Sequence, residues 1–95
     1  MRELRLVFRV HAIQRMFQRN ISVEEARQVV AAGEAIETYP DDKPFPSRLL
    51  LGWNGSRPIH VVVAENAAVG ETIVITVYQP NAAEWEPGFR RRIRP

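Results

Sequence analysis

Residues 48–78 read RLLLGWNGSRPIHVVVAENAAVGETIVITVY and decide the fold. Three apolar runs, rich in leucine and in the β-branched residues that strands favour, are separated by two turn signals. The runs are residues 48–53, 59–64 and 72–78. Asn54-Gly55 is a hairpin signal, although its loop could extend through Pro58, and a second turn falls at 65–71. The stretch therefore predicts an antiparallel meander of strands.

The residues before the meander predict a pair of helices. At the helical period, residues 10–19 separate completely into an apolar and a polar arc, and Asn20 suits a left-handed position at the end of this helix. The apolar arc contains Val10, Ala12, Ile13, Met16 and Phe17. Ser22 and Glu25 form the capping box of a second helix, which Gly33 ends. Because the link between them is short, the two helices form a compact hairpin.

Two further segments alternate between apolar and polar residues, as strands do. They are residues 4–8 and residues 34–39, and a proline-rich loop follows at 40–47. Helices followed by a run of strands indicate an α+β fold, in which the helical pair covers one face of an antiparallel sheet of about four strands. We expect residues 1–95 to form a single domain that ends in an arginine-rich tail at 90–95.

Composition excludes several classes of protein. The chain has 95 residues, of which 45% are hydrophobic and 25% charged, as in ordinary globular domains. It has no cysteine, which excludes a disulfide scaffold, a thiolate zinc site and cysteine catalysis. No apolar stretch approaches the roughly 18 residues of a membrane span, and charged residues interrupt the N-terminus. We therefore expect a cytoplasmic protein without a membrane span.

Charge is concentrated at the two ends of the chain. Residues 1–19 contain five arginines and one glutamate, and residues 90–95 contain four arginines. These four are Arg90, Arg91, Arg92 and Arg94. Guanidinium groups make paired contacts with phosphates and stack on bases, so basic ends suit RNA or an acidic protein partner. The alternative for the C-terminal run is a solvated basic tail.

The polar arc of the first helix carries the most suggestive group of side chains. His11 is followed at i+4 and i+8 by Arg15 and Arg19, so all three lie on one side. A base or acid beside two fixed cations suits cleavage of a phosphodiester, in which negative charge develops on phosphorus oxygens. The alternative is that His11 is simply part of a solvated, arginine-bearing surface.

Other polar residues of the predicted strands allow two interpretations each. His60 lies in a run that is apolar on both sides, so it is either a satisfied core histidine or a catalyst. Arg48 either points from a strand end toward the helix or lies at the edge of a loop. Thr76 and Tyr78 share one face with Val74, and their hydroxyls face either a ligand or the core.

We expect no metal ion and no cofactor. The histidines lie far apart in sequence, without an HxH or HxxxH pair. Asp41 and Asp42 are adjacent in the proline-rich loop and would need further oxygen ligands to bind a hard cation. The glycines are dispersed, so that neither a P-loop nor a GxGxxG motif occurs.

Residues 11–22, HAIQRMFQRNIS, begin a pattern that continues through HVVVA at 60–64 and TIVITVYQP at 72–80. The pattern resembles a small bacterial family of unknown function, with an HAxxRMxxRxIS opening and a late ITVY strand. Its members resemble the RelE-like and MqsR-like toxins of toxin–antitoxin systems and are often encoded beside a zinc-finger, MqsA-like antitoxin. The resemblance implies a curved antiparallel sheet with packed helices. It also points to the motif positions His11, Arg15, Arg19, His60 and Tyr78.

Two functions from different classes follow. The first is a metal-independent endoribonuclease of toxin–antitoxin type, in which His11 is the general acid or base while Arg15 and Arg19 hold the phosphate. Auxiliary catalytic candidates are Arg48, His60 and Tyr78. The alternative is a non-catalytic RNA- or protein-binding module. Its RNA contacts would be Arg48, Arg90, Arg91, Arg92 and Arg94. A third possibility is that a sheet edge or the loop at 40–47 chiefly binds an antitoxin partner; the sequence does not indicate an oligomeric state.

Overall fold

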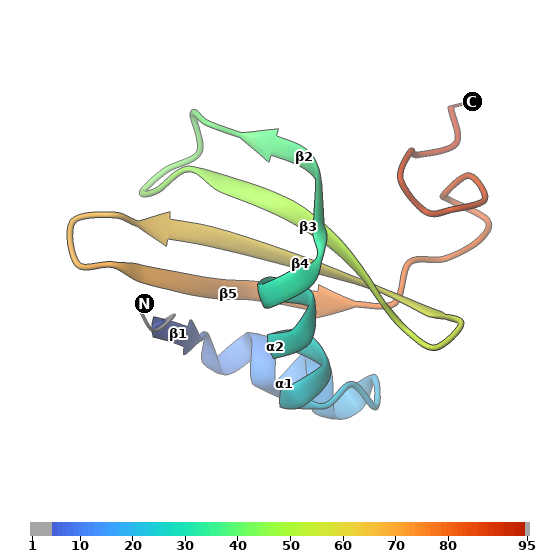
Figure 1. Ribbon diagram of the computed structural model, residues 1–95, viewed down its shortest axis with the longest axis horizontal. Helices are drawn as coiled ribbons and strands as arrows, with labels where there is room; N and C mark the ends of the chain where they lie inside the picture. Colours follow the sequence, from blue (N-terminus) through green and yellow to red (C-terminus); the bar gives the residue numbers. More distant parts are fainter. Residues whose placement is uncertain (1–4, 95) are drawn as a thin grey trace.

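The computed structural model describes residues 5–94. In chain order the elements are β1 (Arg5–Phe8), α1 (Val10–Gln18), α2 (Val23–Ala32), β2 (Glu34–Tyr39), β3 (Ser47–Asn54), β4 (Arg57–Asn66) and β5 (Glu71–Tyr78). The strands form one sheet in the order β1-β5-β4-β3-β2, and both helices lie on the same face of it (Figure 1). The predicted α+β class is confirmed. Among the described residues, no helix has the length and apolar character needed to cross a membrane.

The sheet has five strands rather than about four, and it is mixed rather than purely antiparallel. The predicted run at 4–8 forms β1, which pairs in parallel with β5 so that Leu6 lies opposite Thr72. Leu4 and Pro95 lie outside the described residues. Phe8 and Leu6 pack against the core, and the chain then passes directly into α1, which lies on β5. Because β1 runs parallel to β5, the chain leaves β1 at the point where α1 can pack on β5.

A β-bulge in β5 corrects the predicted face of Val74. Val62 of β4 pairs with Thr76 and Val63 pairs with Val74, so that Ile75 is an extra residue in β5. An extra residue reverses the alternation of side chains beyond it. Val74 therefore joins the core beneath the helices, whereas Thr76 lies on the opposite face. Alternation read from the sequence alone does not show the reversal.

Only part of the apolar arc predicted for α1 faces the core. Ala12 and Met16 are buried against the sheet. Val10 and Ile13 are exposed, and the side chain of Phe17 is 88% exposed. The helix rests mainly on one strand, β5, and one strand covers only a narrow stripe of a helical surface. Amphipathic spacing therefore marked the correct helix but overstated the width of its buried face.

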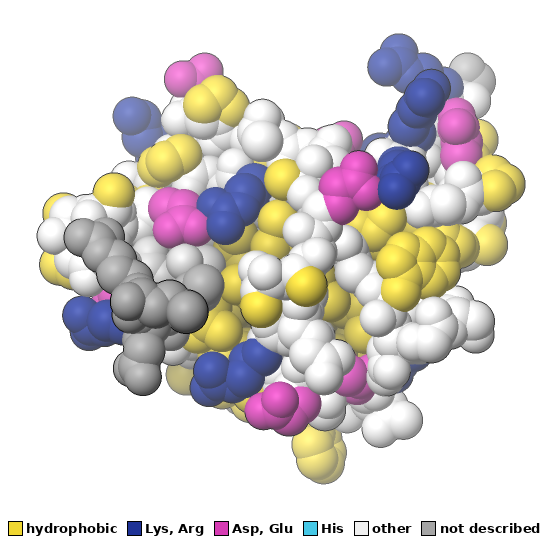
Figure 2. Space-filling view, in the orientation of Figure 1, with side chains coloured by type: hydrophobic (Ala, Val, Ile, Leu, Met, Phe, Trp, Pro, Cys, Tyr) yellow, Lys and Arg dark blue, Asp and Glu magenta, His cyan; other side chains and the backbone are white. Residues whose placement is uncertain are grey.

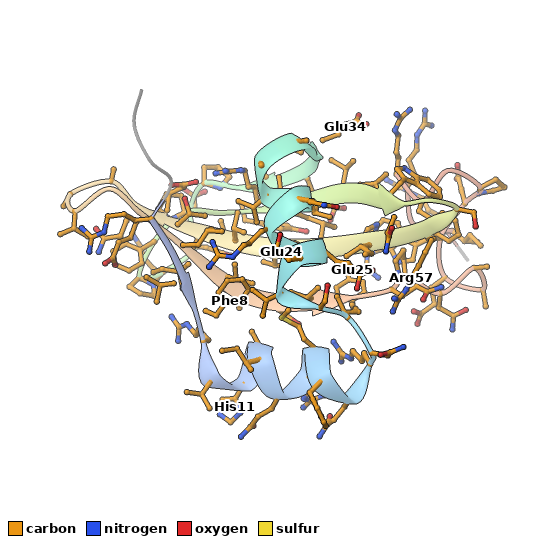
Figure 3. All side chains as sticks on the ribbon, turned by 60° about the horizontal axis from the view of Figure 1, so that its bottom comes forward. Phe8, His11, Glu24, Glu25, Glu34 and Arg57 are labelled. Carbon is orange, nitrogen blue, oxygen red and sulfur yellow. The ribbon has the colours of Figure 1, made fainter. Side chains whose placement is uncertain are left out.

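The junction between the two helices is held by Arg57, at the start of β4. Its guanidinium donates to the carbonyl oxygens of Arg19 and Asn20, at 3.2 and 3.0 Å, where the C-terminus of α1 leaves such groups without helical partners. Asn20 has the predicted left-handed conformation, with φ of 57°. Arg57 also lies 3.4 Å from the carboxylate of Glu25 (Figure 3), and its Nε donates to Gln79. The predicted capping box of α2, between Ser22 and Glu25, is present.

We expect Arg57→Met to destabilise the fold by about 1.5–3 kcal/mol, because methionine keeps the apolar stem and loses the charged hydrogen bonds. The matched control is Arg15→Met, which removes an exposed arginine from α1. Urea unfolding followed by circular dichroism measures both free energies of unfolding. Equal stability of the two variants would show that Arg57 does not hold the helix junction.

Candidate nucleic-acid interface

The three side chains of the first predicted site lie on α1. His11 and Arg15 are exposed, and Figure 3 shows His11 directed away from the sheet. Arg19 instead donates from Nη1 to the carbonyl oxygen of Val77 at 2.7 Å, so its guanidinium is directed to β5. The two hollows described below are lined by other residues. The three side chains predicted to lie on one side of the helix are therefore divided, because Arg19 contacts β5 whereas His11 and Arg15 are exposed.

His60 is fully buried in the middle strand of the sheet, on the face opposite the helices. Its Nε2 lies 2.9 Å from the carbonyl oxygen of Phe89, and a carbonyl only accepts, so Nε2 carries the proton. Its Nδ1 therefore accepts from the hydroxyl of Tyr78, at 3.1 Å. The ring of Trp85 packs against the imidazole edge to face, with centroids 4.4 Å apart. Of the two interpretations of His60, the geometry matches the satisfied core histidine.

The groups around His60 determine its charge state. Burial lowers the pKa of the imidazole, and the nearby guanidinium of Arg92 acts in the same direction, whereas Glu37 and the Phe89 carbonyl favour protonation. Burial also raises the pKa of the hydroxyl of Tyr78. Tyr39 donates to the carboxylate of Glu37, and this bond raises the pKa of Tyr39 to about 12. Burial is the largest of these effects, so the net shift of the His60 pKa is downward and favours the neutral imidazole.

The predicted arginine-rich tail is part of a folded C-terminal segment, residues 79–94. Trp85 is buried, and its ring lies 4.7 Å from the guanidinium of Arg92. Backbone hydrogen bonds of 2.8 and 2.9 Å join Glu86 to Arg91 and Ile93 to Glu84, which folds the segment back on itself. The buried tryptophan and these bonds give the arginines defined positions at one end of the sheet. The segment is therefore not a solvated tail.

The arginines line an open hollow of about 830 Å³, here called the arginine groove. Its lining residues are Ile36, Glu37, Glu86, Arg90, Arg91, Arg92, Ile93 and Arg94. Figure 2 shows their dark blue side chains gathered at the upper right, over the C-terminal segment. Arg90 also pairs with Glu34 at 2.9 Å, which connects the groove to the start of β2.

Arg48, predicted to bind RNA with the C-terminal arginines, is placed elsewhere. Its guanidinium pairs with Glu65 at 2.6 Å, and the same carboxylate accepts from the hydroxyl of Thr72. Arg48 lies near the start of β3, five residues and roughly 17 Å along the strand from Trp53 at its other end. The ion pair therefore belongs to the opposite end of the sheet. Among residues 5–94, no three histidine or acidic side chains gather to hold a metal ion.

A second hollow, of about 500 Å³, was not anticipated from the sequence. It lies between the end of α2 and the β3–β4 hairpin, and Trp53 and Arg90 are among its lining residues. The side chain of Trp53 is 48% exposed, and its ring contacts that of Phe89 edge to face at 5.9 Å between centroids. The available signal was a large aromatic residue directly before the Asn54-Gly55 turn, where a strand end meets solvent.

His60→Gln tests the role of the buried imidazole, because glutamine keeps a donor and an acceptor but does not titrate. The folded-state pKa of His60 lies below its ordinary value of 6.5, so the unfolded chain takes up the proton first. The stability that the neutral imidazole confers is therefore complete above about pH 6.5 and decreases as the pH falls below it. The slope from this one group is at most about 1.4 kcal/mol per pH unit. Urea unfolding at a series of pH values measures it.

His11→Gln is the matched control, because it removes the other histidine, which is exposed. We expect the His60 variant to have a flatter pH dependence than both the wild type and the His11 variant. Identical slopes in the wild type and His60→Gln would contradict a neutral, buried imidazole.

Comparison with known proteins places the chain in a family. A family model described as Domain of unknown function (DUF4258) matches residues 8–79, which include both helices, His60 and Tyr78. No curated protein and no solved structure matches the chain. The match ends where the C-terminal segment begins, so the arginine groove lies largely beyond it. Because the match spans most of its length, the chain belongs to the DUF4258 family of domains of unknown function.

Proposed function

We propose that this protein is a non-catalytic RNA-binding module and that the arginine groove is its phosphate-binding surface. The observation that carries the proposal is the placement of four arginines within five residues of a folded segment, around one open hollow. Phosphate contacts supply most of the affinity of such proteins, and arginine is the residue best suited to make them. A folded segment also holds its cations in place before binding, which lowers the entropy lost on association.

The four arginines have different surroundings within the groove. Arg90 pairs with Glu34, and Arg92 lies over the ring of Trp85. Arg91 and Arg94 are exposed at the groove, so their guanidinium groups can contact phosphates without first leaving an aromatic ring. These two arginines are therefore expected to contribute most of the salt-dependent affinity.

An endoribonuclease is the second candidate, and a position on α1 favours it. His11 and Arg15 are both exposed and lie one helical turn apart, so a phosphodiester could contact both. Catalysis of RNA cleavage also needs a second proton-transferring group around an open concavity. The buried imidazole of His60 lies on the opposite face of the sheet and is already fully hydrogen-bonded. This geometry supports binding better than cleavage.

The resemblance to toxins adds a partner to the proposal. A zinc-finger antitoxin of the MqsA type, encoded by an adjacent gene, would bind this protein and silence it. Co-expression of the two adjacent genes, followed by purification through a tag on one product, tests the association.

We expect the double variant Arg91→Ala/Arg94→Ala to bind a fluorescent single-stranded RNA more weakly than the wild type. Loss of two phosphate contacts lowers the steepness of log K against log salt by about 1.4, because each contact on a single strand releases about 0.7 counterion. Fluorescence anisotropy at a series of salt concentrations measures affinity and slope together.

The matched control, Arg9→Ala/Arg15→Ala, removes the same charge from the exposed ends of α1 and should leave the slope unchanged. Equal losses in the two double variants would mean that only net charge matters, and would count against a defined groove.

We expect labelled RNA to be recovered intact after incubation with the wild-type protein in EDTA, because a binding module does not cleave its ligand. Denaturing gel electrophoresis measures the remaining full-length RNA, with His11→Ala incubated in parallel. Cleavage by the wild type that disappears in His11→Ala would replace the binding module by the endoribonuclease.

A further inference from the structure

The hollow of about 500 Å³ beside Trp53 has the features of a site for a flat, polar ring. Its walls and rim come from three elements: the end of α2, the start of β2 and the end of β3, with the C-terminal segment at its mouth. The lining residues used below are Gln28, Gly33, Glu34, Gly52, Trp53 and Arg90. We call this space the Trp53 hollow.

Two glycines beside the Trp53 hollow allow α2 to pack closely on β3. A Cβ atom on Gly52 would lie 2.5 Å from Cγ2 of Val29, and one on Gly33 would lie 2.4 Å from the carbonyl oxygen of Val29. Neither position can therefore carry a side chain without moving α2 away from β3. The α2 and β3 walls of the hollow are thus closely packed elements of secondary structure.

Trp53 forms an aromatic wall that is held in position. Its exposed ring contacts the ring of Phe89 edge to face, and the carbonyl oxygen of Phe89 accepts from the buried Nε2 of His60. Aromatic pairs of this geometry stabilise by about 0.5–1.5 kcal/mol beyond their buried area. The indole therefore packs, through Phe89, against the same C-terminal segment that carries the arginines.

Polar groups suited to a nucleobase line the same space. The side chain of Gln28 offers a donor and an acceptor, and the carboxylate of Glu34 offers acceptors for an exocyclic amino group. Arg90 lies 2.9 Å from that carboxylate and lines both the Trp53 hollow and the arginine groove. The hollow and the groove are therefore adjacent, with Arg90 between them.

We propose that the Trp53 hollow binds an unpaired nucleobase of single-stranded RNA, stacked on the indole of Trp53, while the flanking phosphates follow Arg90 into the arginine groove. The inference rests on the proposed RNA binding and adds its substrate class. Bases of a duplex are stacked and paired, so they cannot enter such a hollow, whereas proteins that bind single strands combine a cationic track with aromatic stacking. An apolar peptide side chain would fill the space without using the donor and the acceptor of Gln28.

Trp53→Ala tests the stacking contact. We expect it to weaken binding of a single-stranded RNA of 12 nucleotides by about tenfold, because one base stacked on an aromatic side chain contributes on the order of 1–3 kcal/mol. Binding of a blunt RNA duplex of equal length should not change, because its paired bases do not reach the indole. Trp53→Phe should retain most of the affinity, and Phe17→Ala, which removes the exposed aromatic residue of α1, should retain all of it.

The fluorescence of the wild-type protein gives a second measurement that does not require a variant to fold. A base stacked on Trp53 quenches its emission, whereas the other tryptophan, Trp85, is buried. The single strand should therefore quench and the blunt duplex should not. Adenosine monophosphate is the probe for a free nucleotide: saturable quenching by it, with no response to the single strand, would replace RNA by a free nucleotide as the ligand.

The outcomes separate the two proposals. If Trp53→Ala binds the single strand as well as the wild type does, and its remaining emission is quenched as strongly as that of the wild type, the nucleobase site is wrong. The arginine groove then stands. If the wild type binds neither RNA at low salt, the proposed RNA binding itself fails. If a peptide library but neither RNA nor nucleotide quenches Trp53, the hollow is a protein-binding site and the inference is overturned.

Discussion

The structure depends on one buried imidazole, whose two nitrogens hydrogen-bond to β5 and to the C-terminal segment. His60 donates from Nε2 to Phe89 and accepts at Nδ1 from Tyr78, so the ring joins the centre of the sheet to the C-terminal segment. Loss of one partner would leave a buried polar group unsatisfied, at a cost of about 1–3 kcal/mol. Trp85 packs on the same ring and carries Arg92 above it. The positions of the arginines and of the Trp53 wall therefore follow from this contact.

Features of the fold that depend on neighbouring residues were predictable from the sequence. The bounds of β2 agree with the predicted 34–39, and the capping box of α2 forms as expected, because both depend on local periodicity and on side chains three residues apart. The parallel pairing of β1 and the bulge at Ile75 were not predictable. Each depends on which strand lies alongside, and neither requires a distinctive residue type.

The candidate site shows the same division. The sequence placed His11 and Arg15 together on α1, and they share its exposed surface. It could not show that the guanidinium of Arg19 turns to the carbonyl of Val77, because that depends on the contact of α1 with β5. His60 was recognised as a residue of a central strand, but its partner is the backbone carbonyl of Phe89, 29 residues away. A carbonyl is present at every residue, so no sequence pattern identifies that partner.

The buried histidine and the arginine groove differ in their relation to the family match. His60 and Tyr78 lie within the family match at residues 8–79, and the arginines lie beyond it. A sheet that presents a neutral imidazole can hold any following segment that supplies a carbonyl oxygen and an aromatic ring, as Phe89 and Trp85 do here. The charge of the surface would then depend on the sequence after Gln79 and the fold on the sequence before it.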